Sequence, residues 1–225
     1  MNDMDILIDA YIEGWLDCSL PRFDSRNHDI NRCDFDLTQA CRFDDLELAQ
    51  LMIKKGATNI DEGLYMSCVF GRIECVNLMI RKGATSLNKG LCIACRFGQF
   101  ECAYSMVKHG ANDFDGGLKA ACLHGDLKCA ELMINKGATD FNGGLGNACS
   151  RGRVDCVQLM IDKGATDLDS ALKLTQFKSE FSQRHRKCEQ LLIARGAKDF
   201  TKYTTEKYQP GSLTAFVRNA IDSRT

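Results

Sequence analysis

The thirteen cysteines of this sequence are the residues best suited to metal binding or redox chemistry. A zinc site requires three or four ligands that converge on one ion, and a disulfide requires two thiols at close range. Cys92 and Cys95 form the only C-x-x-C pair, and no second pair stands at the spacing of a zinc finger. An odd number of cysteines also excludes complete pairing within one chain. The sequence therefore predicts no metal site.

The four histidines supply no catalytic constellation either. They stand in different contexts, with no cysteine, serine or carboxylate at a shared spacing (His28, His109, His124 and His185). The sequence contains no P-loop, no serine nucleophile elbow and no H-E-x-x-H motif. Gly144-Leu145-Gly146 resembles part of a phosphate-binding loop, but no predicted strand precedes it. We therefore expect no enzymatic activity, no catalytic residues and no cofactor.

The composition narrows the class of protein further. The chain has 225 residues, 44% of them hydrophobic, and a net charge of −1. Such a chain is too apolar to be disordered, and it lacks the excess of Lys and Arg that non-specific nucleic-acid or membrane-surface binding requires. No apolar run approaches the length of about 18 residues that a membrane span needs, and the acidic N-terminus is unlike a signal peptide. We expect a cytoplasmic protein in a reducing compartment.

A repeat of 27 residues organises the chain. A Gly-Ala pair recurs five times at this interval, and a sixth pair follows after 32 residues (Gly56-Ala57, Gly83-Ala84, Gly110-Ala111, Gly137-Ala138, Gly164-Ala165 and Gly196-Ala197). Ten of the thirteen cysteines fall into two columns with the same period (Cys41, Cys68, Cys95, Cys122 and Cys149; then Cys75, Cys102, Cys129, Cys156 and Cys188). A fixed period of this length is typical of a solenoid.

Each repeat is predicted to form two short helices. In the fourth repeat, Asp115 can cap the start of the first helix and Gly125 can end it. A leucine, an alanine and the first cysteine of the repeat then form one apolar stripe at helical spacing. The second helix is expected over 126–136, with Gly137 at its end. Because no unit can bury its stripe alone, we expect an all-α solenoid of stacked helix-turn-helix repeats.

The two cysteine columns are predicted to lie in the core, where cysteine behaves as a small buried hydrophobe. A column of methionines with the same period is assigned to the core as well (Met52, Met79, Met106, Met133 and Met160). Two cysteines of one repeat, such as Cys68 and Cys75, could approach across its two helices, which leaves a disulfide open. Cys18, Cys33 and Cys92 lie outside the columns and are expected to react first with thiol reagents.

The repeat resembles the ankyrin repeat. Its Leu-x-x-Ala-Cys stands where that family has Leu-His-x-Ala-Ala, its Cys-Val-x-Leu-Met-Ile stands where the family has Val-Val-x-Leu-Leu-Leu, and the Gly-Ala turn is shared. The resemblance covers residues 34–200. Ankyrin repeats usually run about 33 residues, so a shorter repeat implies the loss of the β-hairpin finger with its Thr-Pro-Leu-His start. Such finger-less repeats are similar in style to those of large DNA viruses of protists.

The predicted organisation has three parts. Residues 1–33 are expected to form an N-terminal capping helix, at about 3–18, and a linker. Residues 201–225 are expected to form a C-terminal tail with a short capping helix, because a solenoid must cover its open ends. The six repeats between them are assigned to 34–60, 61–87, 88–114, 115–141, 142–168 and 169–200; the sixth is degenerate and carries an insertion of five residues.

The resemblance implies a non-enzymatic scaffold for protein–protein interaction, and we expect a monomer with one protein partner. If the apolar stripe faces inward, the residues two and six positions after each repeat leucine lie on an exposed ridge. These positions vary between repeats and include the aromatic and Arg residues that favour interfaces. The candidate partner-binding residues on and beside this ridge are Tyr65, Met66, Phe70, Ile93, Arg96, Phe97, Lys119, Leu123, His124, Asn147 and Arg151.

Two alternatives stay open. A nucleic-acid-binding solenoid would place the cations of the ridge on phosphates and its phenylalanines on bases (Arg42, Arg72, Arg96, Lys119, Arg151 and Arg153; Phe43, Phe70 and Phe97). A ubiquitin-ligase adaptor would need a ligase-recruiting tail, and 201–225 shows no F-box-like pattern. The connectors between repeats carry a periodic apolar residue, which we assign to structural packing (Ile60, Leu87, Phe114, Phe141, Leu168 and Phe200).

Overall fold

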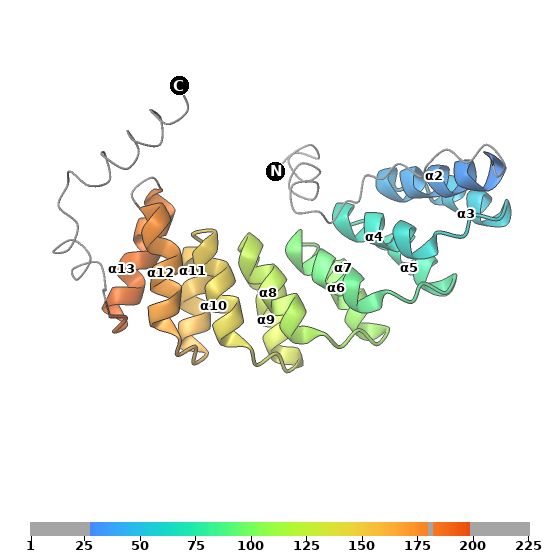
Figure 1. Cartoon of the computed structure of the whole chain (residues 1–225). Helices are drawn as coiled ribbons and strands as arrows, with labels where there is room; N and C mark the ends of the chain where they lie inside the picture. Colours follow the sequence, from blue (N-terminus) through green and yellow to red (C-terminus); the bar gives the residue numbers. More distant parts are fainter. Residues whose placement is uncertain (1–27, 180–181, 199–225) are drawn as a thin grey trace, which may run out of the picture.

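The computed structural model describes residues 28–179 and 182–198 (Figure 1). In this part of the chain there are twelve helices and no strand. The helices are α2 (His28–Phe43), α3 (Leu46–Lys54), α4 (Ile60–Phe70), α5 (Ile73–Arg81), α6 (Leu87–Arg96), α7 (Phe100–Lys108), α8 (Phe114–His124), α9 (Leu127–Lys136), α10 (Phe141–Ser150), α11 (Val154–Asp162), α12 (Leu168–Ser179) and α13 (Gln183–Ala194). The all-α prediction is thus confirmed. The helices predicted near the two chain ends lie outside the described residues.

The helices form six pairs that stack along one direction. The even-numbered helices α2 to α12 are the first helices of the repeats, and the odd-numbered helices α3 to α13 are the second helices. Each first helix contacts the next first helix, and each second helix contacts the next second helix. The main chains of the first helices lie closer together than those of the second helices. The stack therefore follows an arc with the first helices on its inner side (Figure 1).

The core consists of the columns that the repeat defines. All ten column cysteines are at most 1% exposed, and the five column methionines are at most 5% exposed. The repeat leucines, such as Leu118 and Leu145, are fully buried beside them. The assignment of these columns to the core is confirmed. Cys33 and Cys92 are partly exposed, as expected for positions outside the columns, and Cys18 lies outside the described residues.

A glycine near the start of four first helices brings three helices together. In the fourth repeat, a Cβ atom added to Gly117 would lie 2.6 Å from Met133 Sδ and 3.4 Å from Cys95 Sγ. Met133 comes from the second helix of the same repeat, and Cys95 comes from the first helix of the preceding repeat. The same three-way contact recurs at Gly63, Gly90 and Gly144. A Cβ atom at this position would require the flexible end of the methionine to shift, and the sixth repeat has Ala171 there.

The first helices begin earlier than the sequence analysis predicted. Asp113, not Asp115, is the N-cap of α8, and its Oδ1 accepts a hydrogen bond from Gly116 N at 2.9 Å. The assignment of Asp115 as the cap was wrong, because the helix already includes the apolar connector residue. The connector residues pack against the core as the first residues of their helices, which confirms their structural role, and Phe200 lies outside the described residues (Ile60, Leu87, Phe114, Phe141 and Leu168). Gly125 and Gly137 end α8 and α9 in the left-handed conformation, as predicted.

Asp115 instead belongs to a column of Asp and Asn that joins neighbouring repeats. Its Oδ1 accepts hydrogen bonds from Thr139 N at 2.7 Å and Asp140 N at 2.9 Å, both in the connector that leads to the next first helix. In every other described repeat, the side-chain oxygen at this position also accepts a hydrogen bond from a backbone N–H of the next connector (Asp34, Asp61, Asn88, Asn142 and Asp169). Sequence analysis missed this role, although the column keeps the 27-residue period.

A second set of hydrogen bonds joins the repeats at the other end of the first helices. Arg72 Nε donates to Arg42 O at 3.1 Å, Gln99 Nε2 to Val69 O at 3.2 Å, and Arg153 Nε to Leu123 O at 3.3 Å. Each donor precedes a second helix, and each acceptor is a carbonyl at the C-terminal end of the preceding first helix, where helical partners run out. The fourth repeat departs from this pattern, because its Asp126 cannot donate and instead caps α9 at Cys129 N.

The cysteines pair between repeats and not within them, which corrects the expectation for Cys68 and Cys75. The thiol of Cys41 lies close to that of Cys75, and the same holds for Cys95 with Cys129 and for Cys122 with Cys156. Each pair joins a first-column thiol to the second-column thiol of the next repeat. Cys68 lies near Cys102 and Cys149 near Cys188 in the same register. All of these cysteines are free thiols.

The Asp and Asn column predicts the effect of two substitutions on stability. Asp115→Ala leaves two connector N–H groups without their acceptor, so we expect the free energy of unfolding to fall by about 1–3 kcal/mol. Asp115→Asn keeps an acceptor oxygen, as Asn88 and Asn142 do naturally, and should cost less than half as much. Urea unfolding followed by circular dichroism measures both. Equal destabilisation by the two variants would contradict the acceptor role.

Thiol reactivity tests the buried columns. Among the described cysteines, Cys33 should be labelled first by a maleimide under native conditions. Cys92 should follow slowly, because burial and the nearby Asp113 raise the pKa of its thiol to about 12 and keep it protonated. The ten column cysteines should be labelled only after denaturation. Mass spectrometry of timed digests locates the labels, and fast labelling of the columns in the native protein would contradict the core assignment.

The free energy of unfolding should decrease at low pH, in part because Asp61 becomes protonated. Burial alone would raise the pKa of this carboxyl, but the hydrogen bonds from Ser86 and Thr85 together outweigh burial and lower the pKa below its ordinary value of 3.8. The charged form therefore contributes stability that is present above about pH 4 and is lost as the pH falls through the folded-state pKa. Asp61→Asn cannot titrate at this position, so its stability should fall less than that of the wild type on acidification from about pH 6 to about pH 3. A parallel loss in both proteins would contradict this role.

Candidate protein interface

The structure divides the eleven predicted partner-binding residues into a buried and an accessible group. Five of them, all in the second and third repeats, are at most 8% exposed (Tyr65, Met66, Phe70, Ile93 and Arg96). The expectation that these side chains lie on an exposed ridge was wrong. The other six are partly or fully exposed (Phe97, Lys119, Leu123, His124, Asn147 and Arg151). The accessible part of the predicted surface thus lies mainly on the fourth and fifth repeats.

Several buried members make contacts that explain their burial. The guanidinium of Arg42 lies over the Phe70 ring, 5.3 Å from its centroid, and the Lys89 ammonium lies 5.1 Å from the centroid of the Tyr65 ring. Arg96 Nε lies 3.3 Å from His124 Nε2 in the next repeat. Cations above aromatic rings gain electrostatic attraction and cover apolar surface with their aliphatic stems. These contacts join neighbouring repeats.

Among the accessible residues, Phe97 and His124 form a tilted aromatic pair whose ring centroids are 5.7 Å apart. Leu123 lies beside them and Arg151 is exposed one repeat further along. Sequence reasoning missed Leu174, which is 47% exposed on α12. Leu174 stands two positions after the repeat leucine Leu172, so the rule that selected Asn147 would have selected it as well.

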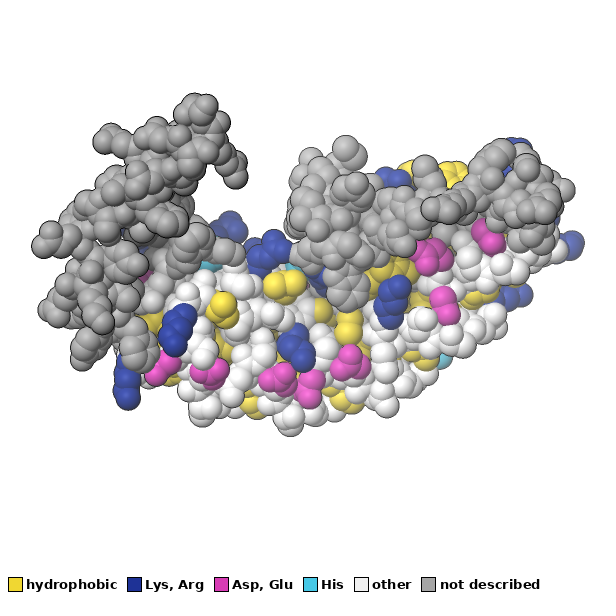
Figure 2. Space-filling view, in the orientation of Figure 1, with side chains coloured by type: hydrophobic (Ala, Val, Ile, Leu, Met, Phe, Trp, Pro, Cys, Tyr) yellow, Lys and Arg dark blue, Asp and Glu magenta, His cyan; other side chains and the backbone are white. Residues whose placement is uncertain are grey.

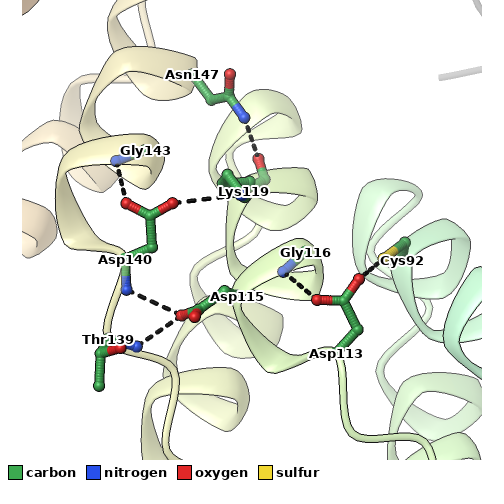
Figure 3. A network of polar contacts seen from close by, with 9 residues as sticks. All are labelled: Cys92, Asp113, Asp115, Gly116, Lys119, Thr139, Asp140, Gly143 and Asn147. Atoms are coloured by element: carbon green, nitrogen blue, oxygen red, sulfur yellow. Dashed lines mark hydrogen bonds and ion pairs between the residues drawn. The ribbon is translucent and has the colours of Figure 1, made fainter.

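A polar network across the fourth and fifth repeats holds two of the accessible residues in place (Figure 3). Asn147 Nδ2 donates to Lys119 O at 3.1 Å, and Lys119 Nζ lies 3.2 Å from Asp140 Oδ2. Asp140 in turn caps α10 by accepting from Gly143 N at 2.8 Å. The Gly143 N–H, followed by the Lys119 ammonium, lowers the pKa of Asp140 below its ordinary value. The network fixes the backbone beneath the surface, while the half-exposed ion pair itself contributes only about 0–1 kcal/mol.

Charge is distributed unevenly over the first-helix side of the stack. Acidic residues follow one edge, at the N-terminal ends of the first helices (Figure 2; Asp113, Asp115, Asp140, Asp167 and Asp169). Cations stand at or just beyond the C-terminal ends (Arg42, Arg72, Arg96, Arg151 and Arg153). Both groups complement the helix dipole, which favours anions at the N-terminus and cations at the C-terminus. A partner on this side meets an acidic edge and a basic edge.

The histidines and the possible metal ligands of the described residues are scattered. No group of three or more His, Cys, Asp or Glu side chains in this part of the chain is placed to hold a metal ion. The ring nitrogens of His109 and His185 lie against backbone carbonyls, those of Ser105 at 2.9 Å and Ser150 at 3.2 Å. Within the same residues, every helix is too short or too polar to cross a lipid bilayer.

Comparisons with known proteins place the fold. No family model matches the sequence, and no curated protein matches it. The chain is similar in structure to the human ASB11 ankyrin repeat domain, with a TM-score of 0.58 and 21% sequence identity over 72% of this chain and 84% of that chain. The similar structure agrees with the stack of helix pairs. The described part of this chain is therefore a solenoid of ankyrin-like repeats without strands.

Proposed function

We propose that the protein is a non-enzymatic scaffold that binds another protein through the exposed first-helix side of its fourth to sixth repeats. The observation that carries this proposal is a constant core beneath a changing surface. The core columns repeat Leu, Ala, Cys and Met from unit to unit, whereas Lys119, Leu123, Asn147, Arg151 and Leu174 differ in chemistry at related positions.

The composition of this surface supports a protein partner. Leu123 and Leu174 offer apolar area, and Arg151 and Lys119 offer charged groups beside them. Protein interfaces combine an apolar centre with a polar rim and favour Arg. The chain has no strand in its described part, so the hairpin tips of longer ankyrin repeats have no counterpart there. The helix faces remain as the surfaces on which a partner can be recognised.

Nucleic-acid binding is the second candidate, and the geometry favours it less. Phe70 is only 8% exposed, so it cannot stack on a base without rearrangement. Arg72 and Arg153 use their Nε atoms to hold the preceding repeat. The acidic edge of the same face would repel a phosphate backbone laid across it. The ubiquitin-ligase adaptor stays a third alternative, since residues 201–225 lie outside the described part.

The proposal is tested by affinity capture with matched variants. The wild type should recover a partner protein from a relevant lysate, and Leu174→Ala combined with Arg151→Ala should lower the affinity for that partner by roughly 2 kcal/mol or more. Tyr104→Ala is the control, because Tyr104 is 49% exposed on the second helix α7. Circular dichroism should show that all variants keep the fold.

The salt response separates the alternatives. An interface that rests on apolar contacts should change little in affinity with salt, whereas phosphate binding weakens steeply. Capture of nucleic acid with a steep salt dependence would replace this proposal by the second candidate. A partner that is lost with Tyr104→Ala and kept with the double variant would move the interface to the second-helix side.

A further inference from the structure

A cleft of about 450 Å³ lies between the fifth and sixth repeats and reaches the end of the fourth. Its lining includes His124 at the end of α8, Arg153 and Asp155 at the start of α11, and Arg184 and Lys187 from α13. His124 also belongs to the proposed interface, so the cleft continues that surface toward the C-terminal end of the array. Its walls are unusually rich in cations for a chain whose net charge is −1.

The cations of α13 are departures from the repeat pattern. Arg184 stands where four of the preceding repeats have a glycine with positive φ, such as Gly125 and Gly152, and the first has Asp44. Lys187 stands where four other repeats have an acidic residue (Glu47, Glu74, Glu101 and Asp155). The sixth repeat is degenerate, yet two of its departures add positive charge to one cleft. Loss of the repeat pattern alone gives no reason for both changes to have the same sign.

The two arginines of the cleft are held near their bases by neighbouring repeats. Arg153 Nε donates to Leu123 O, and the Arg153 side chain packs on Gly125. The Cβ of Arg184 and the ring of His185 lie against Gly152. Neither Arg184 nor Lys187 forms an ion pair within the described residues. Their charges are therefore available to a ligand.

The start of α11 adds backbone donors to the same cleft. Val154, Asp155 and Cys156 line it, and the N-cap of this helix, Arg153, makes no side-chain capping hydrogen bond. The equivalent helix α9 is capped by Asp126, which accepts from Cys129 N at 2.7 Å. The first N–H groups of a helix bind anionic oxygens when no side chain satisfies them. The residues that carry them line the same cleft as Arg153, Arg184 and Lys187.

We propose that this cleft binds a phosphorylated serine or threonine side chain of the partner protein, an inference that rests on the proposed scaffold function. Arg153, Arg184 and Lys187 against the one carboxylate of Asp155 leave the lining with a net charge of +2. A phosphate monoester carries about −1.5 to −2 charges, whereas a carboxylate carries one. Arginine forks also match phosphate oxygens in geometry. The lining comes from the last two repeats and the end of the fourth, so the cleft encloses a ligand the size of one modified side chain better than an extended nucleic-acid backbone.

The test is a titration of the ¹⁵N-labelled full chain with N-acetyl-O-phosphoserine N-methylamide, followed by NMR. The amide signals of Val154, Asp155 and Cys156 should shift, and those of Phe100, Glu101 and Cys102 at the start of α7 should not. α7 is the matched internal control, because its N-cap Gln99 also makes no capping hydrogen bond. The corresponding glutamate derivative should bind about tenfold more weakly.

Variants that restore the repeat pattern should remove the site. Arg184→Gly combined with Lys187→Glu should weaken phosphoserine binding about tenfold or more, while Arg186→Ala, on the same helix but outside the lining, should leave it unchanged. Shifts of equal size at α7 and α11, equal binding of the glutamate probe, or no effect of the double variant would each overturn the inference.

The titration is independent of the test of the scaffold function. If a partner depends on Leu174 and Arg151 but phosphoserine does not bind the cleft, only this inference fails. If phosphoserine binds the cleft but no partner depends on Leu174 and Arg151, the proposed interface fails and the cleft remains an isolated phosphate site.

Discussion

The contact between a glycine, a methionine and a cysteine holds three helices close together in four of the six repeats. At Gly117 the first helix approaches Met133 of its own repeat and Cys95 of the preceding one so closely that a Cβ atom would not fit. The contact recurs in four repeats, and each recurrence fixes three helices at once. The same first helices carry the cross-repeat thiols and the hydrogen bonds that join neighbouring repeats at both ends.

Polar contacts at the two ends of the first helices then fix the register. At one end, carboxylates and amides such as Asp115 and Asn142 bind the N–H groups of the next connector. At the other end, Arg72, Gln99 and Arg153 bind carbonyls of the preceding helix. These groups satisfy backbone atoms that the ends of short helices leave without partners. The partners are local in space yet about 24 to 30 residues apart in sequence, so each repeat is complete only when its neighbour is present.

The sequence was sufficient for the fold because the period is strict. It predicted the helix pairs, the buried columns of cysteine and methionine, and the glycine ends of the helices. It was less informative about side chains whose surroundings come from the next repeat. Asp115 was assigned as the N-cap of its own helix. Within a single repeat, an Asp that caps a helix cannot be distinguished from an Asp that accepts hydrogen bonds from the next repeat. Tyr65 and Phe70 were assigned to the surface because they lie outside the apolar stripe, and the stripe identifies only the side of the helix that faces the core. Both residues lie beneath cations of neighbouring repeats, which no pattern within one repeat reveals.

The cross-repeat pairing of thiols has a consequence for how the length of such an array can change. Cys95 meets Cys129 and Cys122 meets Cys156, so the partner of each first-column thiol is always one unit ahead. Removal of residues 88–114 would bring Cys68 opposite Cys129, and Asp61 would still face its own connector. A duplication would insert one more set of identical contacts. The chain is thus divided into 27-residue units with the same core contacts, and the last junction differs from the others by carrying Arg184 and Lys187. Whole units can be gained or lost in the middle of the array without altering that last junction.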